Sequence, residues 1–195
     1  IEASSWFIYW SSLNGMTSSN AIQFALKSRN SNHKEQRLGA AHFLARSPNI
    51  SLGGEHRELL QFYEGENDPE VRSAVANSFK HDNLMASDEL MRLLLSEKDE
   101  RCQISLLRAA WKNQLLKAED LIPLLTPSQH PLVRSSSANW IKDQAWSVET
   151  YEYFSENFDP SDSLISPSIL TGIIRYNEGS AFWQEKCKEL IQVSP

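Results

Sequence analysis

The chain has 195 residues, and its 19 basic and 25 acidic side chains give a net charge of −6. Hydrophobic residues make up 41% of it and aromatic residues 10%, which is too much for an intrinsically disordered chain. The acidic balance argues against a general nucleic-acid-binding protein, and no apolar run approaches the ~18 residues that a membrane-spanning helix needs. We therefore expect one sizeable domain or one repeat array, and no membrane partner.

The first 32 residues carry two apolar segments that fit the rest of the chain poorly. An aromatic segment at residues 6–13 and a second apolar segment at residues 22–26 each have the spacing of a helix. Because the end of a repeat array needs a divergent unit to cover its core, we expect residues 1–32 to form an N-terminal capping repeat. An exposed aromatic docking patch is the alternative. The chain begins with Ile1 and shows no signal-peptide pattern, so we expect it to be part of a larger protein or a processed product.

From residue 33 onwards, the pattern of an amphipathic helix recurs. Mostly apolar or small residues occupy positions i, i+3, i+4, i+7 and i+8 in frames that start 35, 31 and 31 residues apart, at Gln36, Val71, Cys102 and Val133. A degenerate fifth frame starts at Ser166 and includes Ile169, Leu170, Ile173 and Ile174. The second position of each of the first four frames is small, which favours close packing between neighbouring helices: Gly39, Ala74, Ser105 and Ser136.

A second apolar segment follows each of these helices. The second segments lie at residues 59–63, 90–95, 121–125, 148–158 and 182–193. Asp68 and Pro69 predict an N-cap followed by proline at the first helical position, and Ser87 with the acids after it predicts another helix start. No alternating run bounded by hairpin turns occurs, so the sequence predicts an all-α fold of two-helix units that repeat every 31 to 35 residues.

Four of the helix starts resemble those of HEAT repeats, whose pattern is Asp, two or three residues, Val-Arg and then small residues. Residues 68–76 match this pattern in full, and residues 130–134 match it with His130 in place of the acid. Two further starts match it in part, Asp99 with Gln103 in place of Arg, and Arg37 with His33 in place of Asp. The resemblance spans about residues 33–192. It implies a right-handed α-α superhelix (solenoid) of about five to six HEAT-like hairpins in a single domain, residues 1–195. Because members of this family are mostly scaffolds, it also implies a non-catalytic protein-binding module.

Residues that could carry catalysis or bind a metal are scattered along the chain. Cys102 and Cys187 do not make a disulfide framework or a metal motif, so we expect two buried thiols in a reducing, cytoplasmic compartment. The five histidines lack zinc-binding spacings, and no serine lies in a nucleophile elbow. We therefore expect no enzymatic activity, no catalytic residues, no metal and no cofactor.

Acidic residues concentrate after the first quarter of the chain. Residues 1–50 have 5 basic and 2 acidic side chains, whereas residues 51–195 have 14 basic and 23 acidic ones. Within the acidic part, Glu149, Glu152 and Glu156 recur at i, i+3 and i+7 and share one helix face, which we place opposite Val148, Tyr151 and Phe158. This face is either an ordinary solvated surface or a docking strip for a basic segment of a partner.

The resemblance to HEAT repeats further implies that the second helix of each pair lines a concave face. Polar residues of these helices are therefore our candidate protein-binding residues: Arg57, Gln61, Arg92, Glu149, Glu152 and Glu156. The expected partner is a protein or peptide with a basic segment, or a neighbouring domain of the parent chain.

A second HEAT-like class, the alkylpurine DNA glycosylases, provides the alternative function. These enzymes hold a damaged nucleotide with Trp, Asp and Arg side chains, and residues of the same types here are Trp111, Trp140, Trp146, Asp143 and Arg108. Two observations argue against this function. A groove for DNA must neutralise phosphates, whereas residues 51–195 are acidic, and Trp140 falls on the apolar stripe of its helix.

Overall fold

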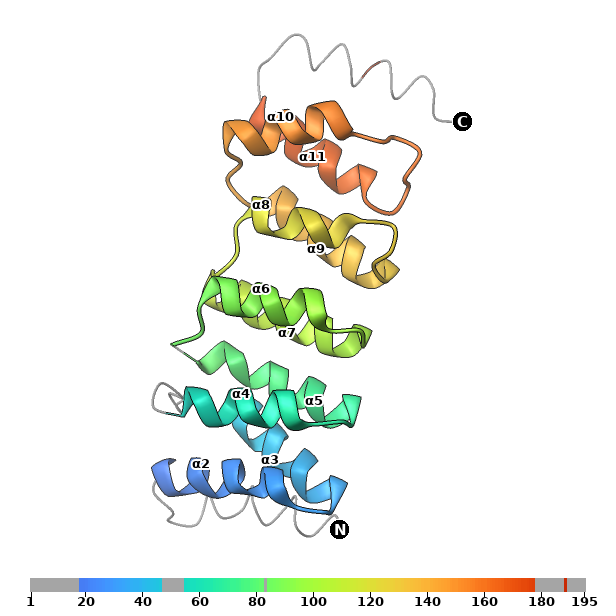
Figure 1. Ribbon diagram of the computed structural model, residues 1–195. Coiled ribbons are helices and arrows are strands. Elements are labelled where there is room, and N and C mark those ends of the chain that lie inside the picture. The colour runs from blue at the N-terminus through green and yellow to red at the C-terminus, as the bar shows by residue number, and fades with distance from the viewer. Residues whose placement is uncertain (1–17, 47–54, 83, 178–187, 189–195) are drawn as a thin grey trace. The chain divides into compact units, whose positions relative to one another are not determined.

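A computed structural model describes residues 18–46, 55–82, 84–177 and 188 (Figure 1). All regular structure in these residues is helical and none of it is strand, which confirms the predicted all-α class. The chain divides into two compact units between Leu115 and Leu116. That it forms a single domain stays a prediction. The helix predicted at residues 6–13, Cys187, and the segment predicted at residues 182–193 except Lys188 lie outside the described residues.

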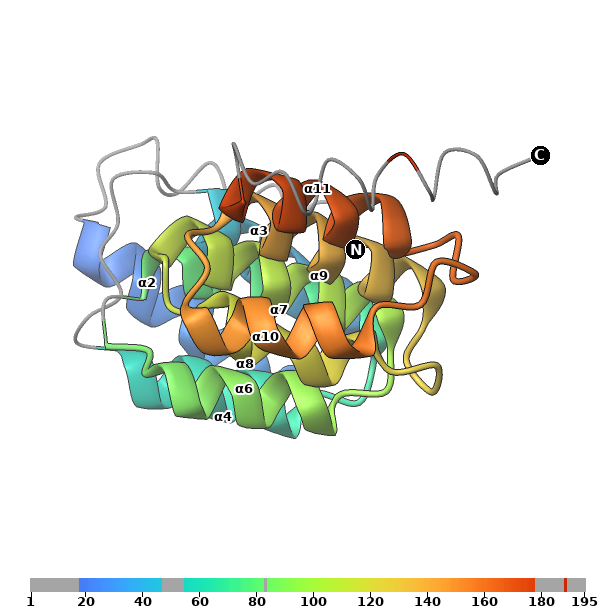
Figure 2. The same cartoon turned by 90° about the horizontal axis from the view of Figure 1, so that it is seen from above.

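The described part of the first unit is built of three helical hairpins in two layers. Helices α3, α5 and α7 pack against one another in sequence and form one layer, while α2, α4 and α6 lie beside them and form the other (Figure 1). Seen from above, α4 and α6 lie on one side and α3 and α7 on the other (Figure 2). The elements are α2 (Ser18–Lys27), the 3-10 helix η1 (Ser28–Asn30), α3 (Lys34–Arg46), α4 (His56–Gly65), α5 (Pro69–Ala76), the 3-10 helix η2 (Asn77–His81), α6 (Ser87–Ser96) and α7 (Glu100–Asn113).

The part of the second unit that the structure describes repeats this arrangement with two hairpins. Helix α9 packs against α11 as well as against α8 and η3, and α10 packs against α11. The elements are α8 (Ala118–Leu121), the 3-10 helix η3 (Ile122–Leu125), α9 (Pro131–Asp143), α10 (Val148–Asn157) and α11 (Ser166–Tyr176).

The pairing of helices differs from the pairing that the sequence suggested. We expected each striped helix to pair with the apolar segment that follows it, but α5 packs against α4, which precedes it, and α7 packs in the same way against α6. The linkers explain this pairing, because only residues 66–68 separate α4 from α5, and only residues 97–99 separate α6 from α7. Connections this short bring consecutive helices directly into contact.

Three of the four helix starts that resemble HEAT repeats are capped by the side chain that carries the resemblance. Asp68 accepts hydrogen bonds from the backbone N–H groups of Glu70 and Val71, at 3.0 and 3.3 Å. Asp99 caps α7 in the same way. His130, which replaces the acid, accepts a 3.3 Å bond from the backbone N–H of Leu132. The predicted N-cap at Asp68 is therefore confirmed, and a histidine can fill the same position at the start of α9.

The predicted apolar stripes are buried in the first unit except at the half-buried Gln36, and they are only partly buried in the second unit. All five members of the frames that start at Val71 and at Cys102 are buried, including the small residues Ala74 and Ser105. Ser105 also explains why a small polar residue suits this position, since its hydroxyl lies 2.9 Å from that of Ser73 on α5. In the second unit, the side chain of Ile174 is 43% exposed, so its predicted place on the buried stripe of α11 is wrong.

An arginine at one repeated position connects three of the striped helices, α3, α5 and α9, to the linkers near their ends. Arg37 pairs with Glu66, Arg72 pairs with Glu97, and in the second unit Arg134 pairs with Asp162.

Both members of each pair also bind the backbone. Each arginine donates a hydrogen bond to a carbonyl oxygen that precedes its helix, at Ser31 (2.9 Å), Glu66 (3.0 Å) and Leu125 (2.9 Å) respectively. Each acid accepts a backbone N–H from the next turn, donated by Asp68 (2.9 Å), Asp99 (2.9 Å) and Leu164 (3.2 Å). One side-chain pair therefore connects two consecutive turns to a helix.

The pair of Arg72 with Glu97 is the most extensively hydrogen-bonded of these three arginine–acid pairs. Besides the two bonds from Arg72, at 2.9 and 3.1 Å, its carboxylate accepts a 2.5 Å bond from the hydroxyl of Tyr63. Burial alone would raise the pKa of Glu97, but the hydrogen bonds from Arg72 and Tyr63 outweigh burial and lower the pKa to about 2. The carboxylate therefore stays ionised inside the first unit.

We predict that Glu97→Gln lowers the free energy of unfolding by roughly 1.5–3 kcal/mol at neutral pH, because Arg72 loses its charged partner in a site with little exposure. The matched control is Glu64→Gln, whose pair with Arg92 is about half exposed and whose loss should cost less than about 1 kcal/mol. Since a lowered pKa stabilises the fold above the unfolded pKa, the cost of Glu97→Gln should shrink as the pH falls from about 5 towards 2. Urea unfolding at several pH values measures this difference, and equal losses for the two variants would contradict it.

Candidate functional site

The acidic face of α10 is held outward by contacts on the opposite side of the helix. The hydroxyl of Ser147 caps the helix by accepting a 3.1 Å bond from the backbone N–H of Thr150. Thr150 and Phe154 are buried, and the hydroxyl of Thr150 donates a 2.7 Å bond to Glu119. The ring of Tyr151 stacks on Tyr176 of α11, with centroids 4.6 Å apart. These contacts fix the rotation of α10 about its axis.

With α10 in this orientation, Glu149, Glu152 and Glu156 are all exposed, as the sequence predicted. None of them forms an ion pair with another residue of the part of the chain that the structure describes. The prediction for the opposite face is partly wrong, because Val148 is 55% exposed and the buried positions belong to Thr150 and Phe154. Because the buried residue Thr150 is polar, the apolar spacing in the sequence did not indicate this buried face.

The three candidates of the first unit lie on the exposed sides of α4 and α6. Arg57 is exposed on α4. Gln61, one turn further on, accepts a 2.9 Å bond from Arg29. Arg92 on α6 pairs with Glu64 at 2.7 Å, with both side chains about half exposed. Gln61 and Arg92 thus already have partners within the chain, and surface pairs of this kind contribute little to stability.

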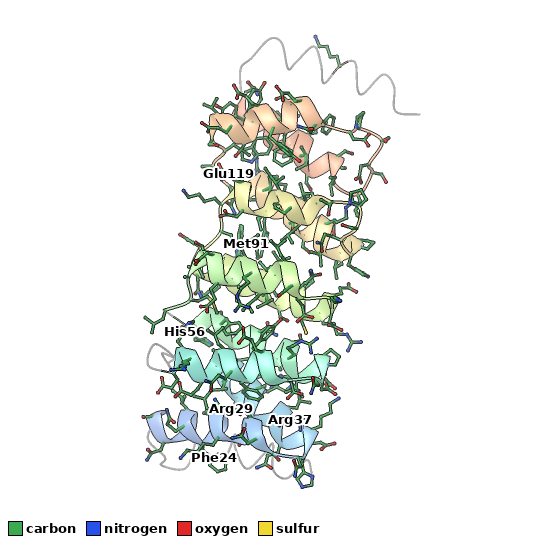
Figure 3. All side chains as sticks on the ribbon, in the orientation of Figure 1. Phe24, Arg29, Arg37, His56, Met91 and Glu119 are labelled. Atoms are coloured by element: carbon green, nitrogen blue, oxygen red, sulfur yellow. The ribbon has the colours of Figure 1, made fainter. Side chains whose placement is uncertain are left out.

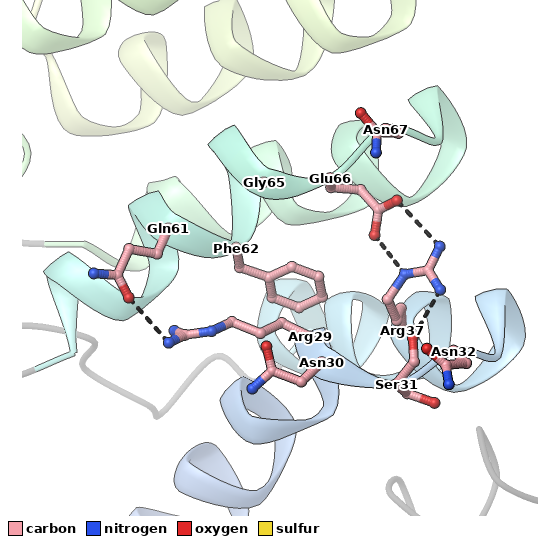
Figure 4. Close-up of a pocket in the computed structure, with 10 residues that line it drawn as sticks. All are labelled: Arg29, Asn30, Ser31, Asn32, Arg37, Gln61, Phe62, Gly65, Glu66 and Asn67. Atoms are coloured by element: carbon pink, nitrogen blue, oxygen red, sulfur yellow. Dashed lines mark hydrogen bonds and ion pairs between the residues drawn. The ribbon is translucent and has the colours of Figure 1, made fainter.

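Gln61 also lines a polar pocket of about 410 Å³ between η1 and the C-terminal end of α4 (Figure 4). The ring of Phe62 lies between the side chains of Arg29 and Arg37. Both guanidinium groups are engaged by the protein itself. Arg29 donates to the carbonyl oxygen of Glu58 at 3.1 Å and to Gln61, and Arg37 pairs with Glu66 at 2.7 Å. The charges around this pocket therefore serve the connection between the first two hairpins.

The residues of the alternative glycosylase function are used in other ways. Trp146 donates a 2.6 Å bond to the carbonyl oxygen of Ile141, and its ring lies 5.1 Å from that of Phe154. Asp143 pairs with Arg175 at 2.9 Å. Trp140 is half-buried, while Arg108 and Trp111 are exposed on α7 in the first unit. At least one tryptophan and the aspartate thus have structural partners inside the second unit.

Trp146 can occupy its position only because residue 172 of α11 has no side chain. A Cβ atom built on Gly172 would lie 2.0 Å from the indole ring, so the ring is packed directly against the helix backbone. This contact holds the half-buried Trp146 ring between Phe154 of α10 and the backbone of α11.

We predict that Gly172→Ala lowers the thermal midpoint, because overpacking of a core typically costs ~1–3 kcal/mol. Gly65→Ala at the end of α4 is the matched control. Its Cβ would meet no atom within 4 Å, and alanine there should be neutral or should stabilise the fold by up to about 1 kcal/mol. Thermal melts of the two variants measure the contrast, and an unchanged midpoint for Gly172→Ala would show that Trp146 is not packed in this way.

A histidine is held between two carboxylates, an arrangement that no motif in the sequence indicates. His56 lies at the start of α4 (Figure 3). Its Nδ1 is 2.5 Å from the Asp82 carboxylate and its Nε2 is 2.9 Å from the Glu89 carboxylate. The Asp82 side chain is fully buried. Burial alone would lower the pKa of His56, but the hydrogen bond and charge of Asp82, together with Glu89, outweigh burial and raise the pKa. The ring links α4 to the turn after η2 and to α6.

We predict a pH-dependent contribution of His56 to stability. Because its folded pKa lies above the unfolded value of about 6.5, the contribution is full below that value and is lost as the pH rises through the folded pKa. His56→Gln should therefore destabilise the protein more at about pH 5.5 than at about pH 9. Urea unfolding of both proteins at the two pH values tests this. A constant difference between them would mean that the ring is neutral.

Other possible chemistry has little support in the described residues. Cys102 is buried, as predicted, and burial raises its pKa to about 12, which keeps the thiol unreactive. No group of three or more His, Cys, Asp or Glu residues in residues 18–46, 55–82 and 84–177 could hold a metal ion. The same part of the chain has no helix long and apolar enough to cross a membrane.

Comparisons with known proteins gave no match. No family model, no curated protein and no solved structure matched the chain.

Proposed function

We propose that this chain is a non-catalytic protein-binding module of HEAT-like helical hairpins arranged as a right-handed superhelix, and that it recognises a basic segment of a partner protein. The acidic face of α10 carries this proposal, because three glutamates are exposed there without an ion pair in the described residues. The repeated helix caps and arginine–acid pairs support the HEAT-like part of it. A cytoplasmic location remains part of the proposal.

The charges around α10 favour a cationic partner. From Leu116 to Asn177 the chain has four basic and eight acidic residues. Two of the four bases already pair with acids, Arg134 with Asp162 and Arg175 with Asp143. An uncompensated cluster of one sign attracts a partner of the opposite sign during diffusion and suppresses binding of partners with the same sign.

The alternative, a DNA glycosylase with a Trp/Asp/Arg site, has less support. Trp146 packs on Gly172, and Asp143 pairs with Arg175, so neither side chain is available to a nucleotide without rearrangement. The exposed acids of α10 would also repel phosphates. Binding to duplex DNA is therefore an outcome that the experiment below should include.

The test measures binding of a fluorescent lysine- and arginine-rich peptide by fluorescence anisotropy. We expect saturable binding that weakens steeply as the salt concentration rises, since charges in solution are screened over about 8 Å at 0.15 M salt. The triple variant Glu149→Gln, Glu152→Gln, Glu156→Gln should bind at least about tenfold more weakly at low salt, which corresponds to about 1.4 kcal/mol.

The matched control is a triple variant in the first unit, Glu64→Gln, Glu70→Gln, Asp88→Asn, which changes the net charge by the same amount at exposed positions. It should keep most of the wild-type affinity. An equal loss in both triple variants would show a mere effect of net charge and would overturn the proposal. So would tighter binding of duplex DNA than of the peptide.

A further inference from the structure

A cavity of about 280 Å³ lies beside α10 in the second unit, where the turn after η3 faces the loop between α10 and α11. Its apolar lining includes three buried side chains from three different elements, Leu125, Phe154 and Ile169. Pockets for drug-sized ligands usually measure ~300–1,000 Å³, so this cavity suits a single side chain better than a whole small molecule.

One carboxylate at the cavity remains available to a ligand. Asp162 is already paired with Arg134, so the charges of these two lining residues offset each other. Asp159 is exposed and receives two hydrogen bonds from Ser161, at 2.8 and 2.6 Å, both on Oδ1. These bonds lower the pKa of Asp159 and keep it ionised. Its Oδ2 makes no hydrogen bond or ion pair within the described part of the chain.

An exposed aromatic ring connects this cavity to the acidic face of α10. Tyr153 lines the cavity, is 41% exposed and packs edge-on against Phe154, with ring centroids 5.2 Å apart. Residues three and four apart are neighbours on a helix surface, so Glu149 and Glu156 flank Tyr153 on its solvent side. A cation that is attracted by these glutamates therefore comes close to the Tyr153 ring.

We propose that this cavity binds one arginine side chain of the partner segment, with its guanidinium between the Tyr153 ring and the Asp159 carboxylate. The apolar lining contacts the aliphatic stem of the arginine, as such stems do on apolar surfaces. Arginine fits better than lysine because its planar group can stack on a ring and also bind a carboxylate with two parallel hydrogen bonds. This inference rests on the proposed function, in which the glutamates attract the basic segment.

The experiment uses the whole chain and three peptides with two flanking lysines and a central residue that is arginine, lysine or citrulline, the neutral isostere of arginine. We expect the arginine peptide to bind at least about tenfold more tightly than the citrulline peptide, with the lysine peptide in between. Asp159→Asn, which preserves the acceptor for Ser161, and Tyr153→Leu should each bring the ratio of arginine to citrulline affinity close to one.

Glu152→Gln is the matched control. It removes an exposed charge from the same helix, yet its residue lies next to Tyr153 in sequence and on a different part of the helix surface. This variant should weaken the arginine and citrulline peptides by the same factor and leave their ratio unchanged.

The outcomes separate the two proposals. If Asp159→Asn and Tyr153→Leu keep the wild-type ratio while the triple glutamate variant still loses binding, the arginine cavity is wrong and the proposed function stands. If no peptide binds the wild-type chain, both the arginine cavity and the proposed function are wrong. Circular dichroism of each variant establishes that a loss of the ratio does not come from unfolding.

Discussion

The arginine–carboxylate pairs at the ends of the hairpins are the interaction on which the rest of the structure depends. An ion pair of low exposure is stabilising only if further hydrogen bonds offset the loss of water. Here those bonds come from the backbone. Arg72 also donates to the carbonyl oxygen of Glu66, and Glu97 also accepts from the backbone N–H of Asp99. Each pair therefore fixes the path of two linkers, and the linkers in turn determine which helices lie side by side.

The sequence predicted features that depend on neighbouring residues, but it did not predict contacts between residues that are far apart in the chain. The stripes at Val71 and Cys102 and the cap at Asp68 depend on residues within one or two helical turns, and these predictions agree with the structure. The acids that meet Arg37 and Arg72 lie 29 and 25 residues away, too far for any helical periodicity to reveal. One sign was nevertheless present, because Glu-x-Asp occurs at residues 66–68 and again at 97–99, each time just before a striped helix. The sequence pattern also did not predict which helices pack against each other, because this packing depends on linker geometry rather than on apolar spacing.

The candidate binding cavity occurs where the repeated pattern is interrupted. In the first unit, linkers of three residues join α4 to α5 and α6 to α7, whereas residues 158–165 connect α10 to α11. The longer loop still supplies the acid for the repeated arginine, through Asp162. It also contributes Asp159, which has no counterpart in the short linkers, and it lines the cavity. Loops are common places for binding residues because a rigid scaffold positions them while their sequence is free to vary.

The exposed glutamates of α10 also differ from several exposed acids of the first unit in how their charges are balanced. In the first unit, exposed acids such as Glu64 and Glu70 lie within reach of a base, Arg92 and Lys34 respectively. No lysine or arginine occurs between Gln144 and Ile174, so the glutamates of α10 have no such neighbour nearby in the sequence. Glu149 and Glu152, and Glu152 and Glu156, are like charges at i, i+3 and i, i+4, and each such pair destabilises a helix by about 0.2–0.5 kcal/mol. A bound basic segment would remove this repulsion. The helix would then regain the stability that the repulsion between the glutamates costs it in the unbound chain.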